Sequence, residues 1–160
     1  MNYLGMDKSK VKATVEELNT LLANYHLYYQ NLRNFHWNIQ GEHFLDLHEK
    51  FEQLYDDARL KIDEIAERIL TLRMRPLSQF SDYLDRAEVK EAGKVEEDVK
   101  MVSTILENHR ILIENMRNTL DAADEVGDEG TIDMVGGFLS NLEKVSWMLD
   151  AWLSSRKVTA

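Results

Sequence analysis

The 160-residue chain contains no cysteine, one proline (Pro76) and 7 glycines. The absence of cysteine excludes a disulfide framework, a thiolate zinc site and thiol-based catalysis. The shortage of proline and glycine favours long helices over a sheet of many strands. The sequence also lacks an apolar run long enough to span a membrane, and MNYLGMDKSK at its start lacks the apolar core of an export signal. We therefore expect a cytoplasmic protein with no membrane partner.

Positive charge is also in short supply. Lys and Arg number 19 against 29 Asp and Glu, which gives a formal net charge of -10. An acidic surface repels nucleic acid and attracts cations, although the same charge would also serve solubility alone. Hydrophobic residues make up 44% of the chain and charged residues 30%, a composition typical of a folded protein. We expect a single domain over residues 1–160.

Apolar residues recur at helical spacing in four long segments, at about residues 7–37, 44–74, 95–123 and 131–154. Asp7 or Ser9 is expected to cap the first helix. Gly41 is expected to end that helix or to shape the loop after it. Pro76 is expected to stop the second helix, because proline cannot continue one.

The connection between the second and third helices is long. It reads PLSQFSDYLDRAEVKEAGK and exceeds an ordinary helix-hairpin loop. Within it, SDYLDRAE predicts a short extra helix capped by Ser81. Four long helices with one long central crossover indicate an all-α fold, a ferritin-like four-helix bundle with a short extra helix in the crossover.

Histidines gather around the expected break between the first two helices. The stretch NFHWNIQGEHFLDLHEKFEQLYDD holds three of the chain's five histidines. His36 is expected to end the first helix and His48 to open the second, with Glu52 one turn later. Further along the second helix, Asp63 and Glu67 are four residues apart, so they project from one face and can grip the same ion. Imidazole and carboxylate groups bind divalent metals, and redox iron commonly uses both.

Distance prevents one chain from joining these two groups in a single site. His48 and Asp63 are 15 residues apart, which on a straight helix is about 22 Å. They nevertheless lie on similar helix faces, within about 60° of each other. If two copies of the second helix pack antiparallel across a two-fold axis near Tyr55 and Asp56, His48 of one copy faces Asp63 and Glu67 of the other. The sequence therefore predicts two equal sites at an interface between copies.

Simpler interpretations stay open for each residue alone. A histidine near a helix end is more often partly solvated, and a pair such as Asp63 and Glu67 is more often an exposed helix face. The Glu-x-x-His pairs of bundle-centred di-iron proteins and the HExxH zinc-protease motif are absent from the sequence. A nucleophile elbow, a Walker loop and a dinucleotide fingerprint are absent as well. Spacing alone leaves a metal site and a solvated face both open.

The run NFHWNIQGEHFLDLHEKFEQLYDDARLKIDEIAERIL closely resembles the signature of the Dps family, the mini-ferritins that protect DNA in starved cells. The likeness covers essentially the whole chain, including the crossover and the final helix. It implies a homo-dodecameric cage with a ferroxidase centre between two-fold-related subunits. By position, it implies that His36 and His48 of one chain and Asp63 and Glu67 of its partner are the catalytic metal ligands. Glu52 stands where the family has an acidic residue that aids the site.

The resemblance also implies the chemistry. Each site would bind two Fe(II) ions and oxidise them preferentially with hydrogen peroxide rather than dioxygen. The Fe(III) product would be stored as ferric oxyhydroxide, which protects against oxidative stress, and zinc or other divalent metals would compete for the site. Trp37 matches a tryptophan that commonly lies near the iron, and with nearby tyrosines it could supply an electron to a stray oxidant.

Acidic pores that admit cations are a further property of the family. The stretch LDAADEVGDEGTID is the best counterpart in this chain. The candidate pore residues are Asp121, Asp124, Asp128 and Asp133. An acidic loop in solvent is an equally open interpretation.

The chain departs from the family at its ends. DNA-binding members often carry a lysine-rich N-terminal tail, whereas this chain has only Lys8, Lys10 and Lys12 there, with Arg156 and Lys157 at the other end. A dodecamer of subunits with a charge of -10 each would be a strongly acidic shell. Direct DNA binding is therefore expected to be weak or absent.

Two alternatives to a ferroxidase follow from the resemblance. A nucleoid protein that coats DNA is disfavoured by the charge. A structural cage with a degenerate metal site is disfavoured by the complete set of four expected ligands. Among the other histidines, His43 is expected at the surface, and His26 and His109 are expected to be structural.

Overall fold

The computed structural model describes residues 3–157, with side chains described as far as Ser155. Every regular element in this range is a helix, which confirms the predicted fold class. The elements are α1 (Lys12–Asn38), α2 (Phe44–Thr71), α3 (Phe80–Arg86), α4 (Asp98–Asp124) and α5 (Glu129–Lys157). None of the helices in the described range is both long and apolar enough to cross a bilayer.

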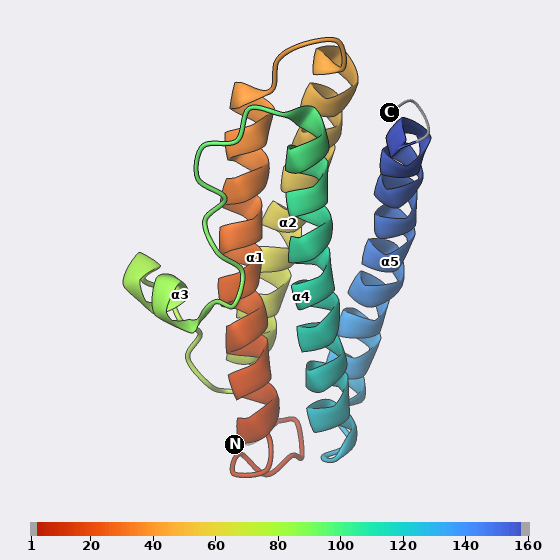
Figure 1. The fold of residues 1–160 in the computed structure, drawn as a ribbon. Coiled ribbons are helices and arrows are strands. Elements are labelled where there is room, and N and C mark those ends of the chain that lie inside the picture. Colours follow the sequence, from red (N-terminus) through yellow and green to blue (C-terminus); the bar gives the residue numbers. More distant parts are fainter. Residues whose placement is uncertain (1–2, 158–160) are drawn as a thin grey trace.

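The four long helices form the bundle, and α3 lies to one side of α1 within the crossover (Figure 1). α1 and α2 are an antiparallel pair, the crossover then returns along the bundle, and α4 runs in the same direction as α2 before α5 turns back (Figure 1). α1 packs against α2, α3 and α4, and α4 packs against α5. This is the single-crossover topology of ferritin-like bundles.

The core is built from the apolar stripes that the periodicity predicts. Phe35 of α1 and Phe51 of α2 are fully buried with ring centroids 5.8 Å apart. Leu18, Ile65 and Met101 are also fully buried. Burial of each such side chain contributes about 1.5–3 kcal/mol. This packing aligns the first two helices and brings their ends together at the 39–43 loop.

A row of asparagines on α1 holds the crossover, and the sequence pattern did not reveal it. Their side-chain amides hydrogen-bond to the backbone on both sides of α3, at residue 77 and within residues 88–93. The bonds are Leu77 N to Asn19 Oδ1, Glu88 N and Val89 N to Asn24 Oδ1, Asn31 Nδ2 to Lys90 O, Ala92 N to Asn31 Oδ1, and Asn34 Nδ2 to Gly93 O. Buried backbone groups that lack secondary structure need such partners.

The first two helix boundaries differ from the prediction. α1 begins at Lys12 rather than near Asp7, because the Asp7 carboxylate accepts hydrogen bonds from Ser9 N and Oγ and closes a separate turn. α2 ends at Thr71, before the predicted Met74. Arg73 takes a φ of 64° and Met74 N donates to Ile69 O. This is a Schellman ending made by the backbone, so the helix stops ahead of Pro76.

The remaining boundaries need smaller corrections. α3 starts at Phe80 with Gln79 before it, so Ser81 lies inside the helix and does not cap it. α4 starts at Asp98 rather than at Val95. α5 starts at Glu129 and continues beyond the predicted end at Ser154. The loop role predicted for Gly41 is confirmed, since its φ of 96° in the turn between α1 and α2 is a conformation that glycine adopts readily.

Candidate metal centre

His36 and His48 meet where α1 ends and α2 begins. His36 Nδ1 lies 2.8 Å from the carbonyl oxygen of His48, and His48 Nδ1 lies 2.8 Å from the carbonyl oxygen of His36. The two rings stack with centroids 3.8 Å apart and an angle of 18° between their planes. The hydrogen bonds are thus reciprocal, and each ring is oriented by the backbone of the other residue.

This arrangement determines which nitrogen can bind a metal. A carbonyl oxygen only accepts, so Nδ1 of each neutral ring carries the proton and donates it. The lone pair is then on Nε2, the nitrogen available as a ligand. A hydrogen bond from the other ring nitrogen to a carbonyl is the support usual for metal-binding histidines, and it raises the basicity of the ligand.

Glu52 completes a group of three possible ligands. The ligand atoms of His36, His48 and Glu52 all lie within 4.8 Å of one another, so one ion could contact all three. His36 is buried, His48 is half-buried and Glu52 is exposed. The carboxylate therefore lies on the solvent side of the two imidazoles.

Aromatic side chains wall this group. Tyr55 approaches His36 edge-on with ring centroids 5.3 Å apart, and Phe44 stacks on His48 at 4.9 Å. Partial burial, together with the charges of Glu52 and Asp56, raises the pKa of Tyr55. The phenol is therefore neutral near pH 7. The two aromatic rings thus contact the two imidazoles, one each.

The subunit does not bring Asp63 and Glu67 to this group. Both are exposed and lie further along α2, one helical turn apart on the same face. Among the described residues, the three-ligand group contains neither of them. Their predicted contribution to the site of a second copy stays a prediction.

Trp37 follows His36 but turns outward. Its side chain is 58% exposed, and the Arg33 guanidinium lies 4.6 Å from its ring centroid. The ring is a neighbour of the candidate centre in sequence and part of the outer surface of one subunit.

The other histidines have structural contacts. His26 stacks on Tyr83 at 3.9 Å, and burial lowers the pKa of His26 to about 4. His109 is buried in the bundle. His43 is half-buried rather than fully at the surface, with Nε2 3.9 Å from Asp98 and its ring edge-on to Trp152. It joins the α1–α2 turn to α4 and α5.

The predicted pore residues divide into two kinds. Asp121, Asp124 and Asp133 are exposed. Asp128 is only 1% exposed, forms an ion pair with Arg68, and accepts hydrogen bonds from Thr131. Its carboxylate tethers the start of α5 to α2, so the geometry does not support Asp128 as a pore residue.

Sequence reasoning missed the support around the ligands. The reciprocal carbonyl bonds of the two histidines depend on the exact path of the chain through the 39–43 turn, which side-chain spacing does not reveal. The contact between Tyr55 and His36 had a weak signal, because Tyr55 is seven residues after His48 and so lies on the ligand face of α2.

Comparisons with known proteins agree on one kinship. A family model described as "Ferritin-like domain" matches residues 15–157. The DNA protection during starvation protein of Porphyromonas gingivalis is 44% identical over 95% of this chain and 96% of its own length.

Solved structures show the same likeness. A DPS protein of Vibrio cholerae O1, described as a member of a broad superfamily of ferritin-like diiron-carboxylate proteins, is 44% identical with a TM-score of 0.92, covering 94% of this chain and 95% of its own. Dps from Listeria innocua, in a crystal soaked with zinc, is 30% identical with a TM-score of 0.85, covering 88% of this chain and 96% of its own.

Proposed function

The chain belongs to the Dps family of ferritin-like proteins, and on that basis we propose that it is a ferroxidase that oxidises Fe(II), preferentially with hydrogen peroxide, and stores the Fe(III) product. Membership supports a role in iron storage and stress protection. The observation that carries the proposal further is the group of His36, His48 and Glu52 with its oriented imidazoles.

The donor set suits iron as substrate. Two imidazoles and one carboxylate bind a divalent ion and leave coordination positions open for a second set of ligands and for an oxidant. Asp63 and Glu67 of a second copy would add oxygen ligands, which favour the harder Fe(III) and so promote the loss of an electron. Each site would take two Fe(II) ions, so that peroxide receives two electrons and becomes water with little release of hydroxyl radical.

An apolar stripe on α2 supports the second copy. Leu45, Leu60 and Leu70 are 76%, 53% and 55% exposed. Each lies three residues from an expected ligand, since Leu45 precedes His48, Leu60 precedes Asp63, and Leu70 follows Glu67. A water-exposed face with this much apolar surface gains by packing against another copy, and a two-fold axis near Tyr55 and Asp56 would then build two equal sites.

The same proposal extends to the assembly. Copies related by such axes would form a dodecameric cage with iron mineral inside, and the exposed Asp121, Asp124 and Asp133 would line the entry pores.

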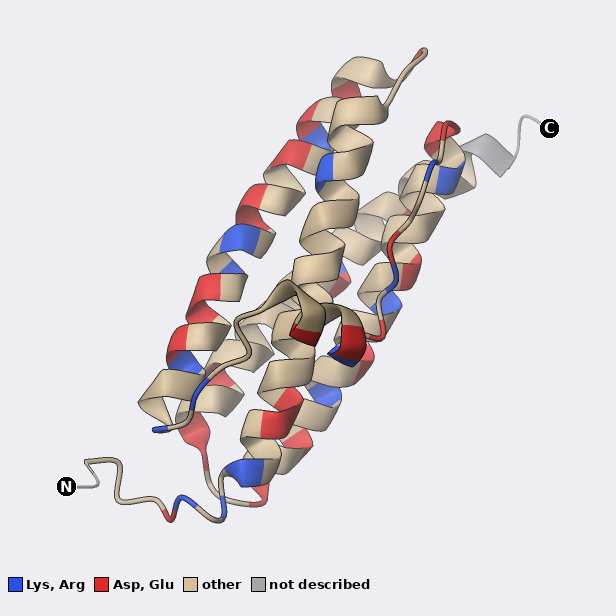
Figure 2. Cartoon of the chain, turned by 90° about the vertical axis from the view of Figure 1, so that its left-hand side faces the viewer, with Lys and Arg blue, Asp and Glu red and all other residues tan. Residues whose placement is uncertain are grey.

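Zinc and other divalent ions would compete for the imidazoles, as they bind the same donor types. Figure 2, a cartoon coloured by residue type, shows Lys and Arg interspersed with Asp and Glu along the helices, so the charge pattern does not support a cationic surface for DNA.

The test is anaerobic loading with Fe(II) followed by one addition of hydrogen peroxide, with Fe(III) read by near-ultraviolet absorbance. The wild type should oxidise iron fast with peroxide and slowly with air. An Asp63→Asn, Glu67→Gln double variant should lose the fast phase. Glu64→Gln is the matched control, since Glu64 is an exposed carboxylate on the same helix but outside the expected ligand set.

Equal rates in the wild type and the double variant would contradict the shared site. Mixing the double variant with a His36→Gln, His48→Gln variant adds a sharper readout. If sites are shared across a two-fold axis, mixed dimers regain one complete site, and the mixture should recover part of the lost activity after reassembly. Sites contained within one chain would show no recovery.

A further inference from the structure

A hydrogen-bonded chain runs through the middle of the bundle and plays no part in the proposed metal site. Tyr28 on α1 and His109 on α4 are 2% and 1% exposed, and the phenol oxygen lies 2.9 Å from His109 Nε2. His109 Nδ1 lies 2.8 Å from Ser146 Oγ on α5. Ser146 Oγ in turn donates to the carbonyl oxygen of Leu142 at 2.7 Å.

The hydrogen bond from Ser146 to the Leu142 carbonyl determines which atom donates in each of the other two hydrogen bonds. Because the Ser146 proton points to a carbonyl, the Ser146 oxygen accepts from His109 Nδ1–H. His109 Nε2 then carries the lone pair, and Tyr28 donates its phenolic proton to it. Burial lowers the pKa of His109 to about 3, so the imidazole is neutral at rest and does not keep an extra proton.

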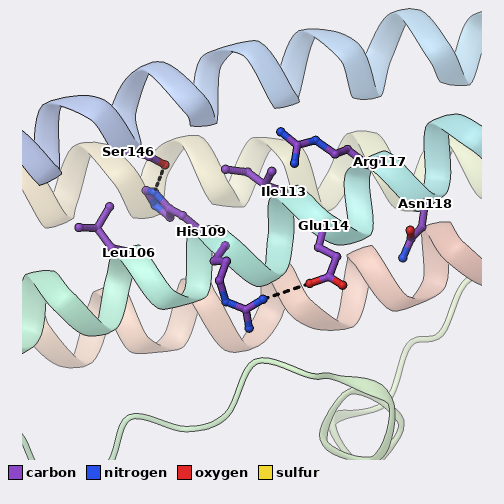
Figure 3. A pocket seen from close by; sticks show the side chains of 8 residues that line it. Leu106, His109, Ile113, Glu114, Arg117, Asn118 and Ser146 are labelled. Carbon is purple, nitrogen blue, oxygen red and sulfur yellow. Dashed lines mark hydrogen bonds and ion pairs between the residues drawn. The ribbon is translucent and has the colours of Figure 1, made fainter.

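The chain ends at a pocket that opens to solvent. This pocket, of about 460 Å³, lies between α4 and α5 and is lined by His109 and Ser146 together with Leu106, Ile113 and Arg117. Figure 3 shows His109 pointing across to Ser146 at the pocket wall. Water in the pocket can therefore exchange a proton with Ser146, although Tyr28 itself is buried.

Tyr25, one turn earlier on α1, provides an internal contrast. The rings of Tyr25 and Tyr28 are 6.0 Å apart, and both are buried. Burial raises the pKa of both phenols, so neither is ionised at rest. In an apolar core, a phenol that loses an electron must also lose its proton, since the radical cation would be a buried unpaired charge. Among the described residues, the Tyr25 hydroxyl has no hydrogen-bond partner, whereas Tyr28 has an acceptor.

Two ring contacts lead from Tyr29, the residue after Tyr28 on α1, toward the candidate metal centre. Tyr29 is the next residue on α1, and its ring lies 6.0 Å from that of Tyr55. Tyr55 lies 5.3 Å from His36. These two contacts give an electron a short aromatic route between Tyr29 and the place where Fe(II) would meet its oxidant, and Tyr28 is joined to that route by the helix backbone.

We propose that Tyr28, His109 and Ser146 form a redox site that consumes one-electron oxidants of the hydroxyl-radical class. The oxidant takes one electron from Tyr28 and is reduced to hydroxide. The Tyr28 O–H bond breaks and its proton goes to His109 Nε2, while the Nδ1 proton passes to Ser146 Oγ. The Ser146 hydroxyl turns from the Leu142 carbonyl and releases its own proton to pocket water. The released proton combines with the hydroxide to form water, and a neutral tyrosyl radical remains.

The site is then restored by iron. A further Fe(II) ion returns one electron to the Tyr28 radical and becomes Fe(III), while a proton re-enters along Ser146 and His109. The net change is one radical reduced to water and one Fe(II) oxidised. This inference rests on the proposed function, because the ferroxidase reaction would supply both the oxidant and the Fe(II). Oxidation of Tyr28 itself requires neither iron nor peroxide.

The test is electron paramagnetic resonance on the intact assembly, frozen shortly after peroxide is added to the Fe(II)-loaded protein. The wild type should show a tyrosyl radical whose g values indicate a hydrogen bond to the radical oxygen. Tyr28→Phe should lower its yield about tenfold or more, because the phenol with the proton acceptor is gone. Tyr25→Phe should leave the yield unchanged, and iron oxidation should keep its rate in both variants.

A second oxidant separates this inference from the proposed function. A photochemically generated one-electron oxidant, applied without iron, should give the same Tyr28-dependent signal. A signal with light but not with iron and peroxide would support the redox site and contradict the ferroxidase as its source. A Tyr28→Phe signal equal to that of the wild type with both oxidants would overturn the redox site, whatever the iron kinetics.

The proton exit has its own variant, which avoids the core. Ser146→Ala removes the outlet at the pocket wall and should slow radical formation several-fold, while a Ser103→Ala control, on the exposed face of α4, should not. An unchanged rate in Ser146→Ala would contradict the proposed proton path. This readout stays decisive even if Tyr28→Phe does not fold.

Discussion

His36 and His109 are buried histidines in one bundle, and their surroundings give them opposite chemistry. Each places Nδ1 in a hydrogen bond of 2.8 Å, His36 with a carbonyl and His109 with the Ser146 hydroxyl. They differ at the other nitrogen. His109 Nε2 accepts the proton of Tyr28, whereas the ligand group of His36 includes a second histidine and a carboxylate within 4.8 Å.

The difference shows that burial alone does not make a histidine structural. What decides is whether the second nitrogen already has a donor. At the α1–α2 break, Nδ1 bonds to the backbone, and the lone pairs of two rings stay available for a cation. In the bundle centre, both nitrogens of His109 are hydrogen-bonded to side chains of other helices, so no lone pair of that ring stays available for a cation.

The largest expected effect comes from removing a ligand of the group around His36 and His48. His48→Gln should lower the rate of peroxide-driven iron oxidation by about 100-fold or more, beyond the ~10–100-fold that loss of a supporting bond alone produces, because a ligand is removed. Stopped-flow absorbance after anaerobic Fe(II) loading measures it. His26→Gln, which replaces a histidine outside the ligand group, should keep the wild-type rate. Similar losses in both variants would indicate a general effect on the fold.

Replacing His109 in the bundle centre should instead lower the free energy of unfolding. His109→Leu leaves the Tyr28 hydroxyl without its acceptor and the Ser146 oxygen without its donor. Each of these groups that water does not reach destabilises the fold by about 1–3 kcal/mol. Urea unfolding followed by circular dichroism measures the change, at fixed protein concentration because assembly contributes. Zinc affinity of the folded variant should match that of the wild type. A loss of zinc affinity would contradict the separation of the two regions.

Acid should sharpen the comparison. His109 has a folded pKa of about 3, below its unfolded value of 6.5, so the unfolded chain binds the extra proton first. Its contribution to stability is therefore complete above about pH 6.5 and is lost progressively as pH falls toward 3, by about 2 kcal/mol between pH 7 and pH 5. Unfolding curves of the wild type and His109→Leu at both pH values should show a smaller pH effect in the variant. An equal effect would assign the acid sensitivity to other groups.

The four long helices could be predicted because their apolar stripes repeat with the helical period, and residues such as Phe35, Phe51 and Met101 are buried as that period requires. Their ends were less predictable. α2 ends at a left-handed Arg73 with φ 64°, and a positive φ is uncommon for any residue other than glycine, so the sequence did not indicate this ending. The predicted stop signal, Pro76, was wrong. The N-terminal turn around Asp7 competes with the helix for the same residues.

The ligands could be predicted from residue type, but their support could not. His36, His48 and Glu52 do assemble, whereas the carbonyl partners that orient the rings belong to a turn. Asn24 and Asn31 gave no signal at all, because their partners lie about sixty residues away in a segment without periodicity. The carboxylates Asp63 and Glu67 need another copy, so one subunit does not test them.

The smallest expected effect is at Trp37. Its ring is 58% exposed and lies outside the ligand group, so Trp37→Phe should change the rate of iron oxidation less than about twofold. If Trp37 supplies electrons to stray oxidants, the same variant should accumulate more oxidised side chains, measured by mass spectrometry of peptides after repeated peroxide additions. Unchanged oxidation would remove Trp37 from that role and leave Tyr28 as the expected donor.

The asparagine row on α1 has a consequence for the crossover. The backbone N–H groups of Leu77, Glu88, Val89 and Ala92 lie outside every helix, yet each donates to an asparagine side chain. Amide hydrogens held in this way exchange with solvent only when the segment detaches from α1. The two stretches that Figure 1 draws as loop on either side of α3, residues 77–79 and 87–93, should therefore show slow deuterium uptake and resist proteases, as a strand inside a sheet would.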